Sequence, residues 1–349
     1  MTNSGLGRRG HRPPEELAEL PEGIERWYIE KNSPFSGHFY GVVETIFEGK
    51  SLFQDIEILR IAHFGKTLFL DKKMQSAETS EWIYHELLVH PVMVAHEKPE
   101  RILIIGGGEG ATAREVFKHP TVKAVDMVEI DIMVYEVCKQ YMPEMNAGAF
   151  DDPRFSLIIG DGRKFVEALS GRPTYDVVIV DATDPLAGTP SYLLYTKEFY
   201  ELVRSVLKPG GLMVSQAEMV CTSDLGIAAL SIYKTVKSVF PIARYYSDWV
   251  PSFYSEWGFV VGSEDVDPAA LSAEEVEARL RGRGISGLKH YTPRRHEIIF
   301  RMPKYFEEAV EKHPRARVVY DSGPLFVFSE PKKPWVPGAE GLGEQASDG

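Results

Sequence analysis

The sequence predicts an α/β protein with a doubly wound parallel sheet, preceded by a small antiparallel β domain. Two patterns support this prediction. Between about residues 25 and 75, short segments alternate apolar and polar residues, with glycine or charged residues between them, as half-buried strands do. From residue 100 onward, apolar runs that end in glycine or aspartate alternate with helical segments. This second pattern is typical of buried parallel strands joined by helices.

The predicted elements run in order along the chain. The β domain contains strands in WYIEK, FYGVVETIFEG, FQDIEILRIAHFG and KTLFLDKK, and a helix from about residue 78 to 95 follows it. The doubly wound part contains the strands RILIIGGG, AVDMVEID, FSLIIGDG, YDVVIVDAT and LMVSQAE, separated by the helices ATAREVFKH, IMVYEVCKQYM, RKFVEALS and KEFYELVRSVL, with a turn at KPGG. A further helix, ALSIYKTVKSVF, and an antiparallel edge pair in ARYYSDWVPSF and EWGFVVGS extend the sheet.

These elements divide the chain into four predicted parts. Residues 24–77 form the β domain, and residues 78–330 form the doubly wound domain. The polar segment 1–23 precedes them, and residues 331–349, which are rich in proline, glycine and charge, follow them. Such segments cannot bury enough apolar surface to fold, so we expect both ends to be disordered tails.

Composition narrows the class of protein and its partners. The 349 residues carry a formal net charge of −12, which argues against nucleic acid, because duplex binding needs a basic surface. No apolar run approaches the ~20 residues that span a bilayer, and the first residues lack the apolar segment of a secretory signal. Two cysteines do not make a disulfide framework. We therefore expect a cytoplasmic protein without a membrane partner.

A glycine-rich loop follows the first strand of the doubly wound part. The loop runs from Gly106 to Gly110, between the strand and the next helix, where glycine lets the backbone turn tightly close to a ligand. Glu129 ends the next strand, 23 residues after Gly106. A carboxylate at that place can accept hydrogen bonds from both hydroxyls of a ribose. Together these features favour an adenosine-type ligand over a surface role for Glu129.

The acid within the loop restricts the kind of adenosine ligand. Glu109 interrupts the glycines, and its carboxylate would repel the pyrophosphate of a dinucleotide. It would equally repel the carboxylate of S-adenosylmethionine. It would attract the primary ammonium of decarboxylated S-adenosylmethionine through a charge-assisted hydrogen bond.

More acids follow the other predicted strands. Asp161 and Gly162 end the third strand, where the aspartate can reach an adenine edge and the glycine leaves room. Further polar residues end the fourth and fifth strands: Asp181, Asp184, Gln216 and Glu218. Since the carboxyl ends of parallel strands meet at one edge of a sheet, these acids and Glu109 predict an acidic cleft for a cation beside the adenosine site.

Several of these segments occur together in one known family. The chain resembles the polyamine aminopropyltransferases, the spermidine/thermospermine synthase family, over about residues 25–330. The matching segments are Phe53-Gln54-Asp55, Tyr84-His85-Glu86, GGGEGATAREV, VEID, the DDPRF loop, GDG, DATDP, LLYT and QAE. The resemblance implies a Rossmann-like, class I methyltransferase-like fold. It also implies transfer of an aminopropyl group from decarboxylated S-adenosylmethionine, a co-substrate, to a polyamine, with no prosthetic group and no metal.

The resemblance also implies roles for single residues. The methylthioadenosine part of the donor would be held by Gln54, Glu129, Asp161 and Gly162, beside the loop that begins at Gly106. Amine groups would be held by His85, Glu109 and Asp184, with Asp181 and Tyr84 at the reacting nitrogen. An alkylammonium has a pKa near 10, so we expect Asp181 to act as general base and Tyr84 to orient the nitrogen. Members of the family form homodimers or homotetramers through the β domain.

Two departures from spermidine synthases bear on the acceptor. The segment DATDPLAGTPSYLLYT lacks the usual PxGP and, with Pro190 and Tyr192, is similar to thermospermine synthases. The segment Val250-Pro251-Ser252-Phe253, with Trp257-Gly258 after it, points the same way. We therefore favour spermidine as acceptor, with a thermospermine- or spermine-type product. The alternative is a spermidine synthase that uses putrescine or agmatine.

Other interpretations were weighed against this one. His85-Glu86 and His90 resemble a zinc-protease motif, but the two histidines are five residues apart, not the four that place both on one helix face. The aromatic cluster Tyr245, Tyr246, Trp249 and Phe253 fits core packing and a wall for the acceptor about equally well. A methyltransferase would share the sheet and Glu129 but not tolerate Glu109, and a non-catalytic scaffold would not need both aspartates.

Overall fold

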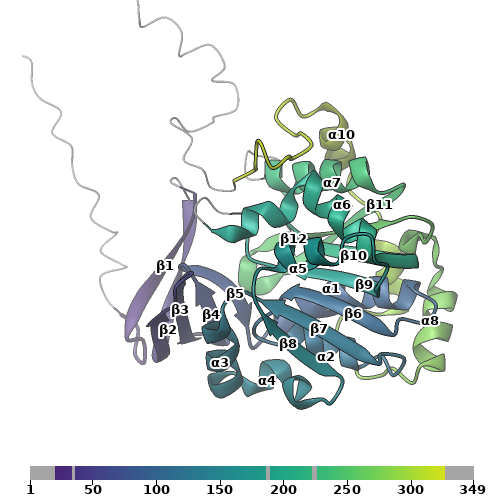
Figure 1. The fold of residues 1–349 in the computed structure, drawn as a ribbon. Helices are drawn as coiled ribbons and strands as arrows, with labels where there is room; N and C mark the ends of the chain where they lie inside the picture. The colour runs from purple at the N-terminus through teal and green to yellow at the C-terminus, as the bar shows by residue number, and fades with distance from the viewer. Residues whose placement is uncertain (1–19, 34–35, 186–188, 222–225, 327–349) are drawn as a thin grey trace, which may run out of the picture.

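The computed structural model of the chain describes residues 20–33, 36–185, 189–221 and 226–326. The predicted C-terminal tail, 331–349, lies outside the described residues, as does the N-terminal segment apart from residues 20–23. Within the described residues, the strands form two separate sheets (Figure 1). No helix in the described ranges is long and apolar enough to cross a membrane.

The first sheet consists of five antiparallel strands in sequence order. The strands are β1 (Arg26–Ser33), β2 (Ser36–Lys50), β3 (Asp55–Ile61), β4 (Gly65–Leu70) and β5 (Lys73–Ala77). The sequence predicted a single strand in KTLFLDKK, and this was wrong: Asp71 and Lys72 both have positive φ, 47° and 65°. Two such residues form the tight turn of a hairpin, so the chain reverses there and adds β5.

The second sheet has seven strands in the order β11-β12-β10-β9-β6-β7-β8. Their bounds are β6 (Arg101–Gly106), β7 (Ala124–Glu129), β8 (Phe155–Ile159), β9 (Tyr175–Asp181), β10 (Leu207–Met219), β11 (Ile242–Val250) and β12 (Ser255–Ser263). Neighbours from β8 to β10 are parallel, and β12 is antiparallel to both β10 and β11. The doubly wound sheet with an antiparallel edge pair is therefore confirmed.

One predicted turn is absorbed into a strand. The segment KPGG lies inside β10, which already pairs with β9 at Leu207 and Tyr175. The register then shifts before Leu212, and Gly210 has a φ of 77°. A glycine with positive φ at a register shift marks a bulge, so the segment bends the strand instead of ending the preceding helix.

Helices cover both faces of the second sheet. Alternate residues of β6 separate the two cores: Ile102 and Ile104 pack with α1 (Glu81–Ala95) and α2 (Ala111–Phe117), whereas Leu103 and Ile105 face the opposite core. That opposite core contains α6 (Lys197–Val206), α7 (Ile227–Val239) and α10 (Lys304–Lys312), and α5 (Gly162–Ala168) packs beside it. This two-sided burial explains the unbroken apolar runs of the parallel strands.

A third core joins the two sheets. Ile56 and Ile58 of β3 and Leu68 of β4 pack against α3 (Ile132–Tyr141) and α4 (Pro143–Asn146). Figure 1 shows α3 and α4 beneath the five-stranded sheet, beside β7 and β8. The packing fixes the first sheet against the carboxyl ends of the parallel strands, which is the edge where α/β sheets bind ligands.

The C-terminal part adds helices that the sequence analysis did not predict. They are α8 (Ala273–Gly282), α9 (Pro293–Ile299) and α10. Arg279 and Arg283 donate hydrogen bonds to the carbonyls of Val94, Ala95 and Met93, which end α1. Cations that bind the last carbonyls of a helix stabilise that end. These residues therefore anchor the helix that carries Tyr84 and His85.

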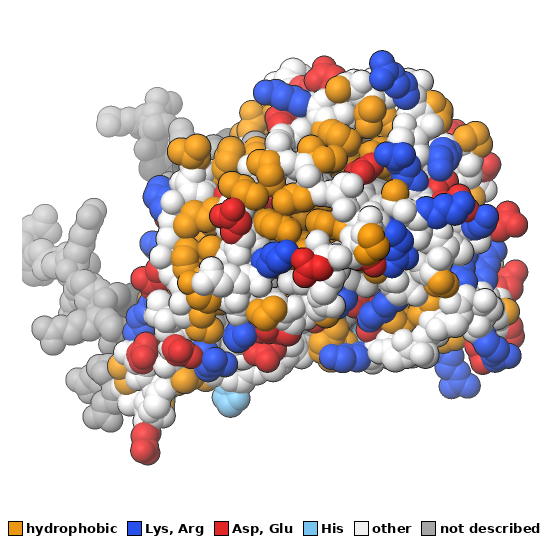
Figure 2. Space-filling model, turned by 60° about the horizontal axis from the view of Figure 1, so that its bottom comes forward, with side chains coloured by type: hydrophobic (Ala, Val, Ile, Leu, Met, Phe, Trp, Pro, Cys, Tyr) orange, Lys and Arg blue, Asp and Glu red, His pale blue; other side chains and the backbone are white. Residues whose placement is uncertain are grey.

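The surface carries charges of both signs. On the face shown in Figure 2, a band of hydrophobic side chains crosses the middle of the molecule, and Lys and Arg lie among Asp and Glu around it. This view shows no continuous basic surface of the kind that binds nucleic acid.

Candidate active site

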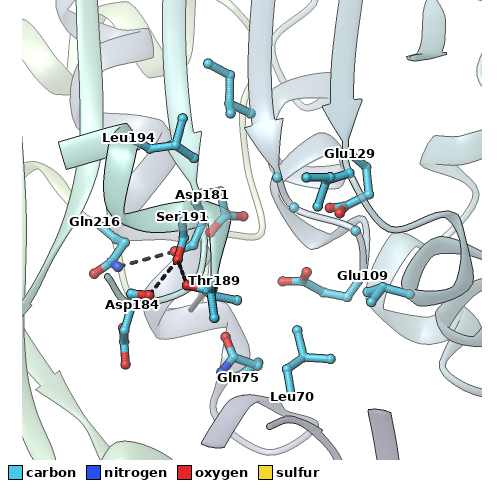
Figure 3. Close-up of a pocket in the computed structure, with 18 of the residues that line it drawn as sticks. Leu70, Gln75, Glu109, Glu129, Asp181, Asp184, Thr189, Ser191, Leu194 and Gln216 are labelled. Carbon is cyan, nitrogen blue, oxygen red and sulfur yellow. Dashed lines mark hydrogen bonds between the residues drawn. The ribbon is translucent and has the colours of Figure 1, made fainter. Parts of the chain in front are cut away.

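The largest part of the predicted site lies in one pocket, at the carboxyl ends of the parallel strands (Figure 3). Strand β6 is followed along the chain by β7 and β8 on one side, and the chain then returns to place β9 on the other. Ligands bind where a doubly wound sheet changes direction in this way. At that point the register pairs Gly106 with Asp181. The pocket encloses about 1190 Å³, including open solvent at its mouth.

The glycine at the start of the loop is required by its contact with β9. Gly106 has a φ of 85°, and a Cβ atom there would lie 2.1 Å from the backbone oxygen of Asp181. Neither the conformation nor the contact tolerates a side chain. Gly106 thus allows the glycine loop and the fourth parallel strand to meet.

Most of the predicted site residues line this pocket, and two lie directly behind it. The lining includes Gln54, Tyr84, Gly106, Glu109, Glu129, Asp161, Gly162, Asp181, Asp184, Gln216 and Phe253. His85 and Glu218 do not line it, but His85 hydrogen-bonds Glu109, and Glu218 hydrogen-bonds Asp184. The structure therefore brings together residues from both sheets that the sequence spreads over 200 positions.

The side of the pocket beside β7 has the donors and acceptors for a nucleoside. Glu129 is buried, and its Oε1 accepts a hydrogen bond from the backbone N–H of Asp131. Gln54, which precedes β3, donates from Nε2 to Asp131 at 3.0 Å. Burial raises the pKa of Glu129 to about 7. Hydrogen bonds donated by ribose hydroxyls would favour the ionised form of this carboxyl.

Asp161 and Gly162 have structural roles as well as a place in the pocket. The Oδ1 atom of Asp161 accepts from the backbone N–H groups of Arg163 and Lys164 and so caps α5. A Cβ atom on Gly162 would lie 2.4 Å from a methyl group of Ile105. The glycine is thus needed for packing of α5 on β6, in addition to the space for a ligand that the sequence suggested.

Asp181 lies at the centre of the pocket with two hydroxyl donors. Tyr84 donates to its Oδ1 at 2.9 Å, and Thr112 donates to its Oδ2 at 2.6 Å. Burial and the negative charge of Glu109 raise the pKa of Asp181 to about 6, against the opposing effects of the positive charge of His85 and the two hydrogen bonds. Burial likewise keeps the pKa of Tyr84 well above its ordinary value, so the phenol stays neutral. The arrangement holds a carboxylate that is ionised at neutral pH and more basic than an ordinary aspartate.

Glu109 and His85 form a buried ion pair beside Asp181. His85 Nε2 lies 2.8 Å from Oε1 of Glu109, and Nδ1 lies 2.9 Å from Oε2 of Glu81. Burial lowers the pKa of His85, but the hydrogen bonds with Glu109 and Glu81 overcome it and raise the pKa to about 10. Both ring nitrogens therefore donate, and the imidazolium carries a positive charge.

The position of the His85 imidazole also bears on whether this group of residues could bind a metal ion. In the part of the chain that the structure describes, ligand atoms of His85, Glu109 and Asp181 lie within 4.8 Å of one another, and no other such group is found. A metal needs a lone pair on imidazole nitrogen, whereas both nitrogens of His85 face carboxylate oxygens. The hydrogen-bond pattern thus fits an imidazolium better than a ligand.

A second group of acids lies beyond Asp181. Asp184 and Glu218 share a hydrogen bond, and burial raises the pKa of both carboxyls. The Oε1 atom of Glu218 is buried with no hydrogen-bond partner among the described residues, and the residue has a φ of 66°. Gln216 accepts from the backbone N–H of Glu218 and holds it in this strained conformation. Asp184 lines the pocket, so its carboxyl is placed where a cation of the substrate can reach it.

An apolar wall lies between the two acidic groups and the first sheet. Phe253 packs edge-on to Tyr84 and lies 4.8 Å from the ring centroid of Trp257. The other members of the predicted aromatic cluster do not line the pocket: Tyr245 and Tyr246 are buried in the two cores, and Trp249 is 53% exposed. Core packing thus applies to Tyr245 and Tyr246, whereas only Phe253 is placed to form a wall of the pocket.

The superficial zinc motif has a different role. His90 is fully buried, with Nε2 2.9 Å from Glu115 and Nδ1 3.0 Å from His119. The contacts link α1 to α2 in the core, on the side of the sheet opposite α6. The histidine is a core residue.

Sequence reasoning missed three residues that support the site. Thr112 holds the second oxygen of Asp181, and Glu81 and Arg114 form an ion pair behind His85. Glu81 could have been found, because it precedes His85 by four residues and α1 brings such residues to the same face. No signal in the sequence distinguishes Thr112 from a core threonine.

Comparisons with known proteins show which family the chain resembles. The family model described as "Spermine/spermidine synthase domain" matches residues 81–270. The family model described as "Spermidine synthase tetramerisation domain" matches residues 26–78. A polyamine aminopropyltransferase of Sulfurisphaera tokodaii is 42% identical over 287 residues, 82% of this chain and 93% of that protein. Polyamine aminopropyltransferase 1 of Hyperthermus butylicus is 47% identical over 262 residues, 73% of this chain and 89% of that protein.

Solved structures show the same similarity. A spermidine synthase in complex with the transition-state analogue AdoDATO has a TM-score of 0.76 and 30% identity, over 85% of this chain and 99% of that chain. A spermidine synthase of Thermotoga maritima has a TM-score of 0.74 and 29% identity, over 86% of this chain and 99% of that chain.

Proposed function

Because the chain belongs to the spermine/spermidine synthase family and is a polyamine aminopropyltransferase, we propose that its acceptor is spermidine and its product a tetraamine of the thermospermine or spermine type. The observation that carries this proposal is the carboxyl of Asp184, which lines the pocket beyond Asp181 and is hydrogen-bonded to the buried Glu218 behind it. It offers a second cation site for an acceptor whose reacting nitrogen lies at Asp181.

The reaction requires a base and releases one proton. The donor, decarboxylated S-adenosylmethionine, has a sulfonium that leaves as methylthioadenosine once the acceptor nitrogen bonds to the adjacent methylene. The acceptor arrives as an alkylammonium with a pKa near 10, so its nitrogen must first lose a proton to expose the lone pair. After the attack, the alkylated product nitrogen carries a positive charge. The one proton released by the reaction is the proton that the base removed from the acceptor.

We assign Asp181 as this base. Its pKa of about 6 leaves it ionised at neutral pH, and the hydrogen bonds from Tyr84 and Thr112 fix its orientation. Tyr84 then orients the acceptor nitrogen for in-line attack. Glu109 receives the ammonium of the donor, and His85 holds Glu109. On the nucleoside side, Glu129 binds the ribose, with the other donor-binding residues beside it: Gln54, Gly106, Asp161 and Gly162.

The remaining lining residues suit an extended acceptor. Asp184 binds a second nitrogen and Glu218 holds Asp184 from behind, while Phe253 with Trp257 packs against the methylene groups between nitrogens. Gln216 keeps Glu218 in place. The segment that resembles thermospermine synthases supports the longer acceptor, although its residues 186–188 lie outside the described ranges.

The acceptor is tested by product analysis. Purified protein is incubated with decarboxylated S-adenosylmethionine and, separately, with putrescine, agmatine, cadaverine and spermidine, and products are identified by mass and chromatography. We expect thermospermine or spermine from spermidine. Product formed only from putrescine or agmatine would overturn the choice of acceptor and make the chain a spermidine-synthase-type enzyme.

The pKa of Glu129 predicts that nucleoside binding depends on pH. Ribose hydroxyls donate to the ionised carboxylate, so the bound state favours ionisation and methylthioadenosine binds more tightly as pH rises through about 7. Below that pH the dissociation constant should rise by up to about tenfold per pH unit. Calorimetric titration with methylthioadenosine between pH 5.5 and 8 measures this, and Glu129→Gln should remove most of the dependence. A flat profile for the unmodified protein would contradict the role of Glu129.

The assembly and location of the protein complete the proposal. The match to a tetramerisation domain over residues 26–78 supports a homodimer or homotetramer formed through the five-stranded sheet. Exposed Ile29 and Phe39 on β1 and β2 provide apolar surface for such contacts. We further propose that the protein acts in the cytoplasm, on small cationic substrates, with no nucleic-acid or membrane partner.

A further inference from the structure

A line of alternating charges runs behind the acid that receives the donor's ammonium. It starts at Glu109 and passes through His85 and Glu81 to Arg114, which also pairs with Glu115. The four side chains come from three segments: the glycine loop, the start of α1 and helix α2. All are largely buried, with exposures of 13%, 1%, 8% and 16%.

Each contact in this line is direct. Arg114 holds both oxygens of Glu81, with Nη1 3.0 Å from Oε1 and Nη2 2.8 Å from Oε2. Such a two-point contact fixes the plane of the carboxylate. Oε2 of Glu81 in turn lies 2.9 Å from Nδ1 of His85, whose Nδ1 is also 2.8 Å from the Glu81 backbone oxygen. The imidazole ring therefore has one orientation available, with Nε2 directed at Glu109.

We propose that Glu81 is a positioning residue, which together with Arg114 fixes the imidazolium of His85 and thereby holds Glu109 in place for the ammonium of the donor. The inference rests on the proposed role of Glu109. Without the charge of Glu81, a buried His85 would retain one carboxylate partner in place of two, and burial favours the neutral ring. Glu109 would then lose the cation that balances it and would be free to rotate away from the donor.

The line also connects two cavities. Glu109 lines the pocket of the reaction, whereas Glu81 and Arg114 line a second cavity of about 890 Å³, open solvent included. Glu144 lines the second cavity too, where it pairs with Lys66 and makes no contact in the line. Glu144 thus provides a matched control, because its replacement removes one negative charge from the same cavity.

The test compares two ligands of one site. Methylthioadenosine lacks the ammonium that decarboxylated S-adenosylmethionine carries, so the ratio of their dissociation constants isolates the ammonium contact. We expect Glu81→Gln to weaken binding of the decarboxylated donor about tenfold and that of methylthioadenosine less than about twofold. The donor KM should rise accordingly, while kcat changes little. Glu144→Gln should leave the ratio unchanged.

Two further variants separate the possible failures. Glu109→Gln tests the role on which the inference rests: if it leaves the ratio unchanged, that role is wrong. If Glu109→Gln lowers the preference for the decarboxylated donor and a folded Glu81→Gln does not, the role of Glu81 alone is overturned. In the double variant, Glu81→Gln should cause no further loss, because Glu109 is already absent.

A structural role would give a different result. Loss of folding would weaken both ligands equally and lower the melting temperature, which is measured in parallel. Should Glu81→Gln not fold, Arg114→Lys keeps the charge but not the two-point contact, and we expect about a threefold loss that is again confined to the decarboxylated donor. Nitrogen NMR of the His85 ring provides a direct readout: imidazolium at neutral pH in the unmodified protein, and a neutral ring in Glu81→Gln. An unchanged ring signal with an unchanged ligand ratio would contradict the proposal.

Discussion

Replacement of Asp181 by asparagine should reduce kcat by about 10³-fold while leaving binding of methylthioadenosine nearly unchanged. General bases contribute about 10²–10⁴-fold, and no other carboxylate accepts hydrogen bonds from both Tyr84 and Thr112 among the described residues. Asparagine can still accept from Tyr84, so the local structure should persist. Single-turnover rates with saturating donor and acceptor measure the loss.

The pH dependence identifies the cause of that loss. In the unmodified protein, kcat/KM should fall as pH decreases through about 6, because protonated Asp181 cannot accept a proton. In Asp181→Asn this decline should be replaced by a rise toward pH 10, where free amine becomes abundant. Asp184→Asn is the matched control from the same segment, and it should raise the acceptor KM more than it lowers kcat. Near-normal turnover of Asp181→Asn with intact donor binding would refute the assignment.

Replacement of Glu109 by glutamine should weaken binding of decarboxylated S-adenosylmethionine by about 10²-fold, with an effect of less than about twofold on methylthioadenosine. Loss of one partner from a buried charge pair costs about 2–5 kcal/mol, and only the decarboxylated donor carries the ammonium. The variant also leaves the positive charge of His85 without its nearest counter-ion in the pocket. Calorimetry with each ligand measures the two constants.

A second result follows from the electrostatics of the same pair. Burial and the charge of Glu109 raise the pKa of Asp181 to about 6, so Glu109→Gln should lower that pKa and extend activity to lower pH. Glu109→Asp retains the charge and should keep both the donor preference and the pH profile close to those of the unmodified protein. Equal losses for the two ligands in Glu109→Gln would show that the carboxylate does not bind the ammonium.

The fold could be predicted in large part because its signals are local. The apolar runs of β6 and β9 and the glycines after β6 reflect burial on two faces and a backbone contact, and each is visible within ten residues. The β4–β5 hairpin could not be predicted from a local signal, because its turn residues Asp71 and Lys72 adopt positive φ and neither is a glycine. The helices after residue 264 were missed because each of them buries only two residues, so their apolar pattern is weak.

The residues that meet in the candidate site were predictable where a residue follows a strand. Glu129, Asp161 and Asp181 stand at strand ends, and the topology alone brings them to one edge. Residues that support the site by holding another side chain do not stand at strand ends, so the sequence did not reveal them. Thr112 is the second residue of α2, and its contact with Asp181 joins positions 69 residues apart. The second role of Gly162, its packing against Ile105, was hidden for the same reason.

The hydrogen bond between Gln54 and Asp131 makes the nucleoside site a joint product of the two sheets. Gln54 precedes β3, whereas Asp131 caps α3 and its backbone N–H holds Glu129. Neither segment alone would form a complete site. A substitution in the five-stranded sheet can therefore alter nucleoside affinity without touching the ligand.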